Sequence, residues 1–147
     1  MIVEEINANN IAPLTHLMIA LWPECSFKEE YENCQQLINS ATETCYLLKK
    51  EDEYIGFIQL GLRTDHVEGA EALPVAYVEG IYVKEEYRKQ GLGEKLISLA
   101  SEWALANGSK QLASDAEIDN QMSIDFHKRI GFKEVNRVVC FIKNISE

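Results

Sequence analysis

The stretch Arg88-Lys89-Gln90-Gly91-Leu92-Gly93 decides the fold, because it joins two segments of different periodicity. Residues 75 to 83 before it are rich in β-branched and aromatic side chains and predict a strand, whereas residues 92 to 107 after it carry apolar side chains at helical spacing. Glycines let a backbone approach a ligand closely, and a helix start offers unpaired N–H groups that favour anions. The stretch, with its two basic residues, therefore predicts a site for a phosphate-bearing cofactor.

The glycine spacing differs from that of other phosphate-binding loops. A Walker loop carries Lys followed by Ser or Thr after its last glycine, whereas here Glu94 follows Gly93. The dinucleotide-binding fingerprint requires three glycines early in a βαβ unit, and that pattern does not fit either. On the glycines alone, a flexible turn at a helix entry explains the six residues equally well. The strand-like segment before the stretch and the helical segment after it favour the ligand-binding loop.

Length and charge limit the function classes. A chain of 147 residues is expected to fold as a single domain, residues 1–147, around one core. The net charge of −10, from 24 acidic and 14 basic residues, argues against a nucleic-acid or anionic-membrane partner and favours a cationic substrate. An acidic surface that only keeps the protein in solution is the alternative explanation.

The cysteines and the N-terminus indicate the compartment. Four separated cysteines, Cys25, Cys34, Cys45 and Cys140, form no C-x-x-C pair, so we expect reduced thiols and no metal site. The N-terminus lacks a basic segment followed by an apolar one, and no run approaches the ~18 apolar residues of a membrane span. The sequence therefore predicts a cytoplasmic protein.

Periodicity and turn residues predict the order of elements along the chain. Ser26 is expected to cap a helix, Glu51-Asp52 to form a hairpin turn, and Gly108 and Gly131 to end helices. The expected elements are a strand at 1–6, helices at 11–21 and from 26, strands at 44–50, 53–62 and 75–83, a helix at 92–107, a strand at 111–114, a helix from 119 or 120 to 131, and one or two strands up to 143.

The strand, loop, helix and strand from 75 to 115 form a parallel crossover, which places the loop at the carboxyl edge of the sheet. The expected fold class is a mixed α/β fold. Its central sheet is mostly antiparallel with one parallel pair, flanked by helices.

This order, the hairpin before it and the helix ending Phe126-His127-Lys128-Arg129-Ile130-Gly131-Phe132 together resemble the fold of the GNAT N-acetyltransferase superfamily over nearly the whole chain. The pattern R-x-x-G-x-G after a strand resembles the acetyl-CoA loop of that superfamily. More narrowly, four segments resemble the aminoglycoside 6'-N-acetyltransferases, which acetylate a primary amine on a polycationic antibiotic. These segments are Leu21-Trp22-Pro23, residues 63 to 69, residues 78 to 83 and Leu112-Ala113-Ser114-Asp115.

The resemblance implies acetyl-CoA as the cofactor, with backbone groups of Ile81, Tyr82 and Val83 pairing with its pantetheine arm. A bulge at Gly80 would turn an N–H group toward the thioester oxygen. Asn120, at the start of the following helix, is implied as a further cofactor contact. The residues implied to hold the pyrophosphate are Arg88, Lys89, Gln90, Gly91, Leu92, Gly93 and Glu94.

By the same resemblance, Trp22, His66, Glu79 and Asp115 line the amine-substrate site. Two carboxylates suit a substrate with several ammonium groups, and a Trp ring can lie against a sugar or a cation. A base must deprotonate the ammonium, so Glu79 is expected to accept the proton and Asp115 to position the 6'-amine, or the reverse. Taken singly, Trp22 reads equally well as a helix-end core residue, Glu79 as an outward strand residue and Asp115 as a strand-end cap.

The expected reaction is direct attack of the amine on the thioester in a ternary complex. Cys25 and Cys45 offer a covalent route, but neither has a recognisable His-paired context. Two positions depart from the pattern. His127 replaces the Tyr that protonates the leaving thiolate in many acetyltransferases, and its imidazole is either that acid or a surface side chain. Asn136 stands where a related antibiotic enzyme presents an acidic substrate contact.

Two other functions stay open. The same chemistry on a polyamine or a protein amine would use the same acidic residues. A non-catalytic acyl-CoA-binding regulatory module would keep Arg88 to Gly93 but lack turnover. The antibiotic-modifying relatives also suggest a resistance role and a homodimer, in which residues 138 to 142 would pair across chains or within one chain.

Overall fold

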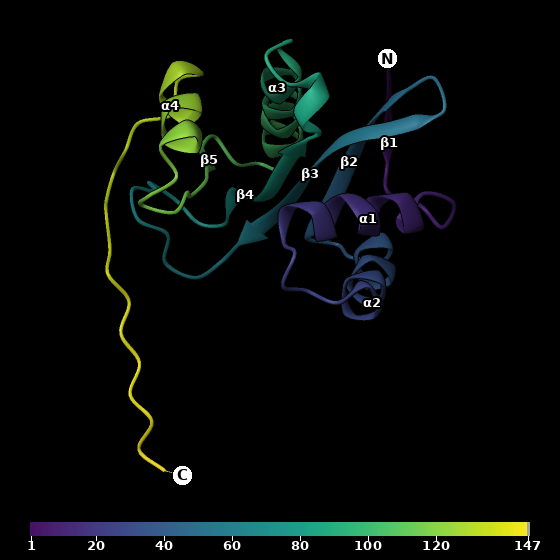
Figure 1. Ribbon diagram of the computed structural model, residues 1–147. Helices are drawn as coiled ribbons and strands as arrows, with labels where there is room; N and C mark the ends of the chain where they lie inside the picture. The colour runs from purple at the N-terminus through teal and green to yellow at the C-terminus, as the bar shows by residue number, and fades with distance from the viewer. Residues whose placement is uncertain (147) are drawn as a thin grey trace. The chain divides into compact units, whose positions relative to one another are not determined.

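Five strands form one sheet in the order β1-β2-β3-β4-β5 (Figure 1). The computed structural model describes residues 1–146. β1 to β4 pair antiparallel in chain order, and β5 joins β4 in parallel. The predicted sheet, mostly antiparallel with one parallel pair, is therefore confirmed. The strands are β1 (Ile2–Glu5), β2 (Glu43–Lys50), β3 (Glu53–Arg63), β4 (Val75–Val83) and β5 (Leu112–Ala113).

The chain divides into two units at Ser114, and the whole sheet belongs to the first unit, Met1–Ser114. This unit also holds α1 (Ile11–Leu21), α2 (Phe27–Ile38), the short 3-10 helix η1 (Glu85–Tyr87) and α3 (Leu92–Ala106). The predicted cap of α2 is confirmed, since the Ser26 hydroxyl accepts a hydrogen bond of 3.2 Å from the Glu29 N–H. No helix among the described residues combines the length and the apolar character that a membrane crossing requires.

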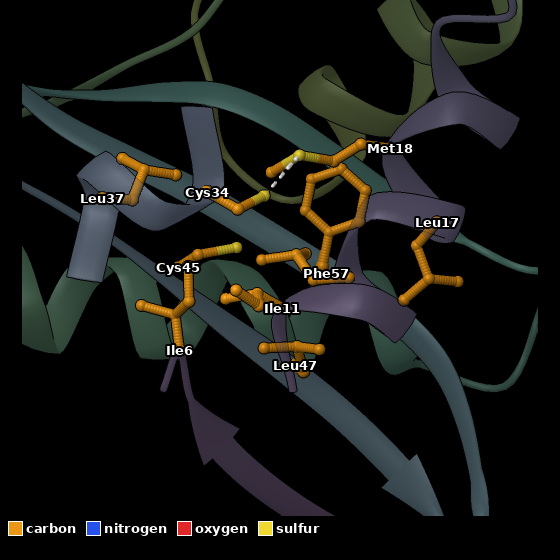
Figure 2. Packing of buried hydrophobic residues seen from close by; sticks show 10 residues of the cluster. Ile6, Ile11, Leu17, Met18, Cys34, Leu37, Cys45, Leu47 and Phe57 are labelled. Carbon is orange, nitrogen blue, oxygen red and sulfur yellow. Dashed lines mark hydrogen bonds between the residues drawn. The ribbon is translucent and has the colours of Figure 1, made fainter. Parts of the chain in front are cut away.

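The two faces of the sheet carry separate parts of the core. On one face, α1 and α2 cover a buried cluster that includes Leu47 and Phe57, seen from close by in Figure 2. Side chains alternate along a strand, so their neighbours Leu48 and Ile58 point to the other face, where α3 contacts β3 and β4. The side chain of Phe57 is fully buried. Burial on both faces makes β3 the centre of the first unit.

The second unit begins at Asp115 and contains α4 (Gln121–Arg129). The predicted start is confirmed, because Asn120 Oδ1 accepts a hydrogen bond of 3.1 Å from the Ser123 N–H. The predicted stop lies at Gly131, whose φ is 101°. The single domain, residues 1–147, stays a prediction.

The prediction of one or two strands before residue 143 is wrong for the described chain, because residues 132–146 form no strand. Figure 1 draws this part as an extended segment after α4. The side chains of Phe141 and Ile142 are 91% and 95% exposed. A strand requires a neighbour that satisfies its backbone groups, and the apolar alternation in the sequence does not supply one.

Candidate functional site

The two halves of β4 have different neighbours. Within residues 1–146, β5 pairs only with Ala76 and Tyr77, whereas β3 pairs along β4 as far as Val83. One edge of β4 therefore lacks a strand partner beyond Tyr77. Such an edge presents N–H and C=O groups to which an extended amide-containing ligand can pair. The predicted ligand-pairing residues Ile81, Tyr82 and Val83 lie on this part of the strand and are half-buried.

A β-bulge lies at the start of the second half of β4. Gln59 pairs with Gly80 and Leu60 pairs with Val78, which leaves Glu79 as the extra residue without a partner in β3. The bulge predicted at Gly80 is therefore present, with the extra residue one position earlier. A bulge bends its strand and re-aims the side chains beside it. Here the re-aimed side chain is that of Glu79.

Trp22 lies directly over Gly80. A β-carbon at residue 80 would come within 2.6 Å of Trp22 Cη2, so only glycine allows this approach. The Trp22 ring also packs edge-on against Phe57, with ring centroids 6.2 Å apart. This contact favours a core role for Trp22, yet the side chain is only half-buried. The contact brings Trp22 next to the bulge, so two of the predicted substrate residues, Trp22 and Glu79, are neighbours.

The carboxylate of Glu79 is held by Arg63, the last residue of β3. Arg63 Nε and Nη2 donate hydrogen bonds of 3.1 Å and 2.5 Å to the two carboxylate oxygens of Glu79. The guanidinium carbon of Arg63 also lies 3.4 Å from the centroid of the Tyr77 ring. A two-pronged bond of this kind fixes the orientation of a carboxylate, and each carboxylate oxygen has a second lone pair for another donor. Glu79 is thus positioned, with capacity left for an ammonium group.

A network of hydrogen bonds holds the segment that follows β4 against the start of β3 and the end of β4. Glu53, at the start of β3, accepts a hydrogen bond of 2.9 Å from Lys84 and one of 2.6 Å from the Tyr87 hydroxyl. These two hydrogen bonds, that from Tyr87 being the stronger cause, lower the pKa of Glu53. Arg88 Nε donates a hydrogen bond of 2.7 Å to the Val83 carbonyl. Arg88 therefore holds the strand end to the loop, in addition to bringing positive charge there.

The start of α3 has the geometry of an anion site. Lys89 and Gly91 have positive φ angles of 63° and 79°, and Gly91 is the N-cap residue of α3. Among residues 1–146, no side chain caps α3, whereas Ser26 caps α2. A glycine cap leaves the first N–H groups of a helix without an internal partner, and those groups together with the helix dipole favour a negatively charged ligand. The predicted phosphate loop therefore has the expected backbone form.

Of the remaining predicted substrate residues in the first unit, His66 is not brought to Trp22 and Glu79 by the structure. His66 lies in the loop after β3, where its side chain is 84% exposed and its Nε2 is 3.3 Å from the Glu68 carboxylate. It makes no hydrogen bond or ring contact with Trp22 or Glu79 in the described part of the chain. Asp115 and Asn120 belong to the second unit, so the pairing of Asp115 with Glu79 stays a prediction.

The two positions that depart from the family pattern have partners close by in the chain. His127 Nδ1 lies 2.6 Å from the Ser123 carbonyl oxygen, and the ring packs edge-on against Phe132. Asn136 Oδ1 accepts a hydrogen bond of 2.9 Å from the Arg137 N–H. Both contacts are local, and neither tests a role in substrate binding or proton transfer.

Cys25 and Cys45 have the environment of unreactive thiols. Burial raises the pKa of Cys25, and the nearby carboxylate of Glu30 adds to the rise. Cys45 is completely buried, and burial raises its pKa well above the ordinary value. A thiol with a raised pKa carries little thiolate at neutral pH and is a poor nucleophile. These environments agree with the expectation that neither cysteine carries an acyl group.

Two features of the site were missed by sequence reasoning. The first is the pairing of Arg63 with Glu79, and the second is the hydrogen bond from Tyr87 to Glu53. Arg63 and Glu53 lie at opposite ends of β3, and the folded sheet brings them to partners that are distant in the sequence. A basic residue at the end of one strand and a glutamate in the next strand give only a weak signal for an ion pair. Whether the two face each other depends on the register of the strands. The register in turn depends on the bulge.

Comparison with known proteins places the chain among acetyltransferases. The sequence profile of the Acetyltransferase (GNAT) family matches residues 11–132. A protein from Serratia marcescens named aminoglycoside N(6')-acetyltransferase type 1 is 36% identical over 139 residues, which cover 94% of this chain and 95% of that protein.

Solved structures agree with this match. The aminoglycoside antibiotic 6'-N-acetyltransferase AAC(6')-Ih from Acinetobacter baumannii is 32% identical and superposes with a TM-score of 0.91 over 99% of both chains. The structure of AAC(6')-Iy in complex with the bisubstrate analogue CoA-S-monomethyl-acetylneamine gives a TM-score of 0.93 at 25% identity over 97% of both chains.

Proposed function

Because this chain belongs to the Acetyltransferase (GNAT) family, we propose that it is an aminoglycoside 6'-N-acetyltransferase, which moves an acetyl group from acetyl-CoA to the 6'-amine of an aminoglycoside and so confers resistance. The observation that carries the proposal is the bulge at Glu79. On one side of the bulge lie the strand edge without a strand partner and the start of α3 without a side-chain cap, and both suit CoA. At the bulge itself lies the carboxylate of Glu79, which Arg63 positions and which suits an amine.

The residues of β4 and the following loop fit an acyl-CoA. Acetyl-CoA supplies an activated acetyl group as a thioester. Backbone groups of Ile81 to Val83 would pair with its amide-containing arm, and N–H groups from Gln90 to Glu94 would face its pyrophosphate. Lys89 adds a positive charge beside that loop, and Asn120 is the contact proposed from the second unit. The Gly80 N–H, next to the bulge, is the proposed donor to the developing oxyanion.

The amine side of the reaction uses Glu79 and Asp115. A sugar ammonium must lose a proton before it can attack, and the Glu79 carboxylate, held in place by Arg63, accepts that proton directly or through water. Asp115 positions the 6'-amine, while Trp22 lies against the sugar ring. His66, in the loop after β3, is proposed as a further substrate contact. The acetyl group is proposed to pass directly to the amine, because the raised pKa values of Cys25 and Cys45 make both thiols poor nucleophiles.

The apolar C-terminal segment supports a homodimer. Val138, Val139, Phe141 and Ile142 are 67% to 95% exposed, and such side chains in an extended segment favour pairing with another strand. We propose that residues 138 to 142 pair with a second copy of the chain. Sedimentation velocity of the intact chain and of a chain ending at Phe132 tests this: a dimer that becomes a monomer supports the proposal, whereas an intact chain that sediments as a monomer contradicts it.

We also propose a cytoplasmic location, because the enzyme draws on cellular acetyl-CoA.

A direct assay tests the proposed reaction. The purified protein is mixed with acetyl-CoA and either kanamycin or its 6'-hydroxy counterpart, while free CoA thiol and product mass are followed. We expect thiol release and one added acetyl group only when the 6'-amine is present. Turnover on polyamines or peptides but not on kanamycin would assign the same chemistry to another amine. Acetyl-CoA binding without turnover on any amine would favour the non-catalytic module.

A further inference from the structure

A Trp ring stands with one edge on the backbone of β4, next to the bulge. The two atoms at this edge, Trp22 Cη2 and Cζ2, lie 2.6 Å and 2.8 Å from the position that a β-carbon on Gly80 would take. Leu21 Cδ2 lies 3.6 Å from the same position. A β-carbon is two bonds away from the backbone nitrogen of its own residue. The apolar atoms of Trp22 and Leu21 therefore lie beside the Gly80 N–H.

The backbone and the ring of Trp22 are both held in place. Its N–H donates a hydrogen bond of 2.7 Å to the Met18 carbonyl of α1, and its carbonyl accepts one of 3.0 Å from the Cys25 N–H. The ring packs edge-on against Phe57, which is fully buried in the cluster of Figure 2. A close-packed core does not move aside without a loss of stability, so we expect the ring to keep its place when a ligand binds.

We propose that Trp22 and Leu21 form a wall that limits the transferred acyl group to acetyl. The inference rests on the proposed function, which places the thioester oxygen at the Gly80 N–H. The acyl carbon is one bond from that oxygen and the methyl group one bond further, so the methyl group meets the apolar edge of the Trp22 ring. Burial of a methyl group against apolar atoms is favourable, whereas each further methylene needs space that the ring occupies.

The wall makes Trp22 a specificity-determining residue for the acyl donor. This role is separate from the sugar contact proposed for the same ring. One methylene more or less in an apolar pocket changes kcat/KM roughly ten- to 200-fold. Leu21 lies further from Gly80 than Trp22 does, so its replacement should have the smaller effect. The expected order of preference is acetyl-CoA, then propionyl-CoA, then butyryl-CoA.

Calorimetry tests the wall without requiring turnover. It gives the Kd of CoA, acetyl-CoA, propionyl-CoA and butyryl-CoA for the intact chain and for Trp22→Leu. The matched control is Trp103→Leu, because Trp103 is the other Trp of the chain and is likewise half-buried, on α3. We expect the intact chain to bind acetyl-CoA roughly tenfold more tightly than butyryl-CoA. Trp22→Leu should lose most of this preference with an unchanged Kd for CoA, and Trp103→Leu should keep it.

Three results would overturn the wall. They are equal affinity of the intact chain for acetyl-CoA and butyryl-CoA, an unchanged preference in Trp22→Leu, and an equal loss of preference in Trp103→Leu. A uniform loss of affinity for all the ligands, CoA included, would overturn it as well, since that loss indicates general damage to the site. Thermal unfolding checks that each variant keeps its fold, and Trp22→Phe takes the place of Trp22→Leu where the latter does not fold.

Turnover separates this inference from the proposed function. If the acyl preference is present and depends on Trp22, but no aminoglycoside is acetylated, then the wall stands and the proposed reaction fails. If kanamycin is acylated from butyryl-CoA as fast as from acetyl-CoA, then the reaction stands and the wall fails.

Discussion

The first and second halves of β4 differ in their strand partners and in the burial of their side chains. Val75 to Val78 are buried, and in this half β4 has strand neighbours on both edges at Ala76 and Tyr77. From Glu79 to Val83 the strand keeps only its β3 neighbour within the described chain, and its side chains are more exposed. One strand therefore serves two purposes. Its first half stabilises the sheet, and its second half offers hydrogen-bonding groups to ligands.

The bulge at Glu79 marks the change between these halves. A strand that continued without a bulge would place its next side chains in strict alternation. The extra residue instead aims Glu79 toward Arg63 and Gly61 while Gly80 makes room for Trp22. Binding sites need unsatisfied groups held by a rigid support, and β4 provides both within nine residues.

The largest expected effect comes from the first residue of the ligand-binding half. Glu79→Gln keeps the shape of the side chain but removes the charge that receives the proton. We expect kcat/KM for the aminoglycoside to fall by about one to two decades, which corresponds to ~1.5–3 kcal/mol, with the KM for acetyl-CoA unchanged. Steady-state kinetics with each substrate varied in turn measures both values.

Glu102→Gln is the control for this variant, since Glu102 is exposed on α3. A similar loss in the control would assign the effect to net charge. A change confined to the KM for acetyl-CoA would contradict the role given to Glu79.

The next largest effect concerns stability, and it is measured with the same substitution, Val→Ala, in each half of β4. Val75 is 1% exposed, whereas Val83 is half-buried. We expect Val75→Ala to lower the free energy of unfolding by about 1.6 kcal/mol, at ~0.8 kcal/mol for each of two buried methyl-sized groups, and Val83→Ala to lower it by less. Urea denaturation measures the difference. Equal losses at the two positions would show that the halves do not differ in their contribution to stability.

A smaller effect is expected in the loop that follows the second half. Lys89→Glu should raise the KM for acetyl-CoA by roughly two- to fivefold, because it places a negative charge near the pyrophosphate at a helix start. The increase should shrink as salt is added. Lys110→Glu, an exposed position before β5, makes the same charge change away from the loop. A matching increase in that control would argue against local phosphate binding.

The smallest effect concerns pH and the network that fastens the strand end. Hydrogen bonds from Tyr87 and Lys84 lower the pKa of Glu53 below its ordinary 4.5. A carboxyl whose folded pKa is lowered stabilises the fold above its unfolded pKa, and this stabilisation is lost as pH falls through the folded pKa. Glu53→Gln should therefore lower the Tm at pH 7 and make progressively less difference below pH 4.5.

Differential scanning fluorimetry of both proteins across this range checks the prediction. A Tm difference that stays constant with pH would mean that the charge of Glu53 does not contribute to the network.

Most elements of the chain up to residue 131 could be predicted because their signals are local. Ser26 caps α2 with its own hydroxyl, and Gly108 ends α3 with a φ of 81° that glycine adopts readily. Glu51 has a φ of 55° in the hairpin turn, where an acidic two-residue turn was expected. Each of these signals depends on a few neighbouring residues, so the sequence alone contains it.

The features that could not be predicted depend on contacts between distant segments. The position of the bulge depends on how Gln59 and Leu60 pair with β4, and the hold of Arg63 on Glu79 follows from that pairing. The prediction of strands before residue 143 is wrong for a related reason. Alternating apolar residues form a strand only where a neighbouring strand can pair with them. The site residues came from a family resemblance, and their roles stay proposals.

Amide hydrogen exchange tests the difference between the two halves of β4 most directly. Exchange rates of single residues are measured by NMR in the free protein and with saturating CoA. We expect CoA to slow exchange at Ile81 to Val83 and at Leu92 to Glu94, and to leave Val75 to Val78 unchanged because the sheet already protects them. Unchanged exchange in the second half, or equal slowing along the whole strand, would contradict it.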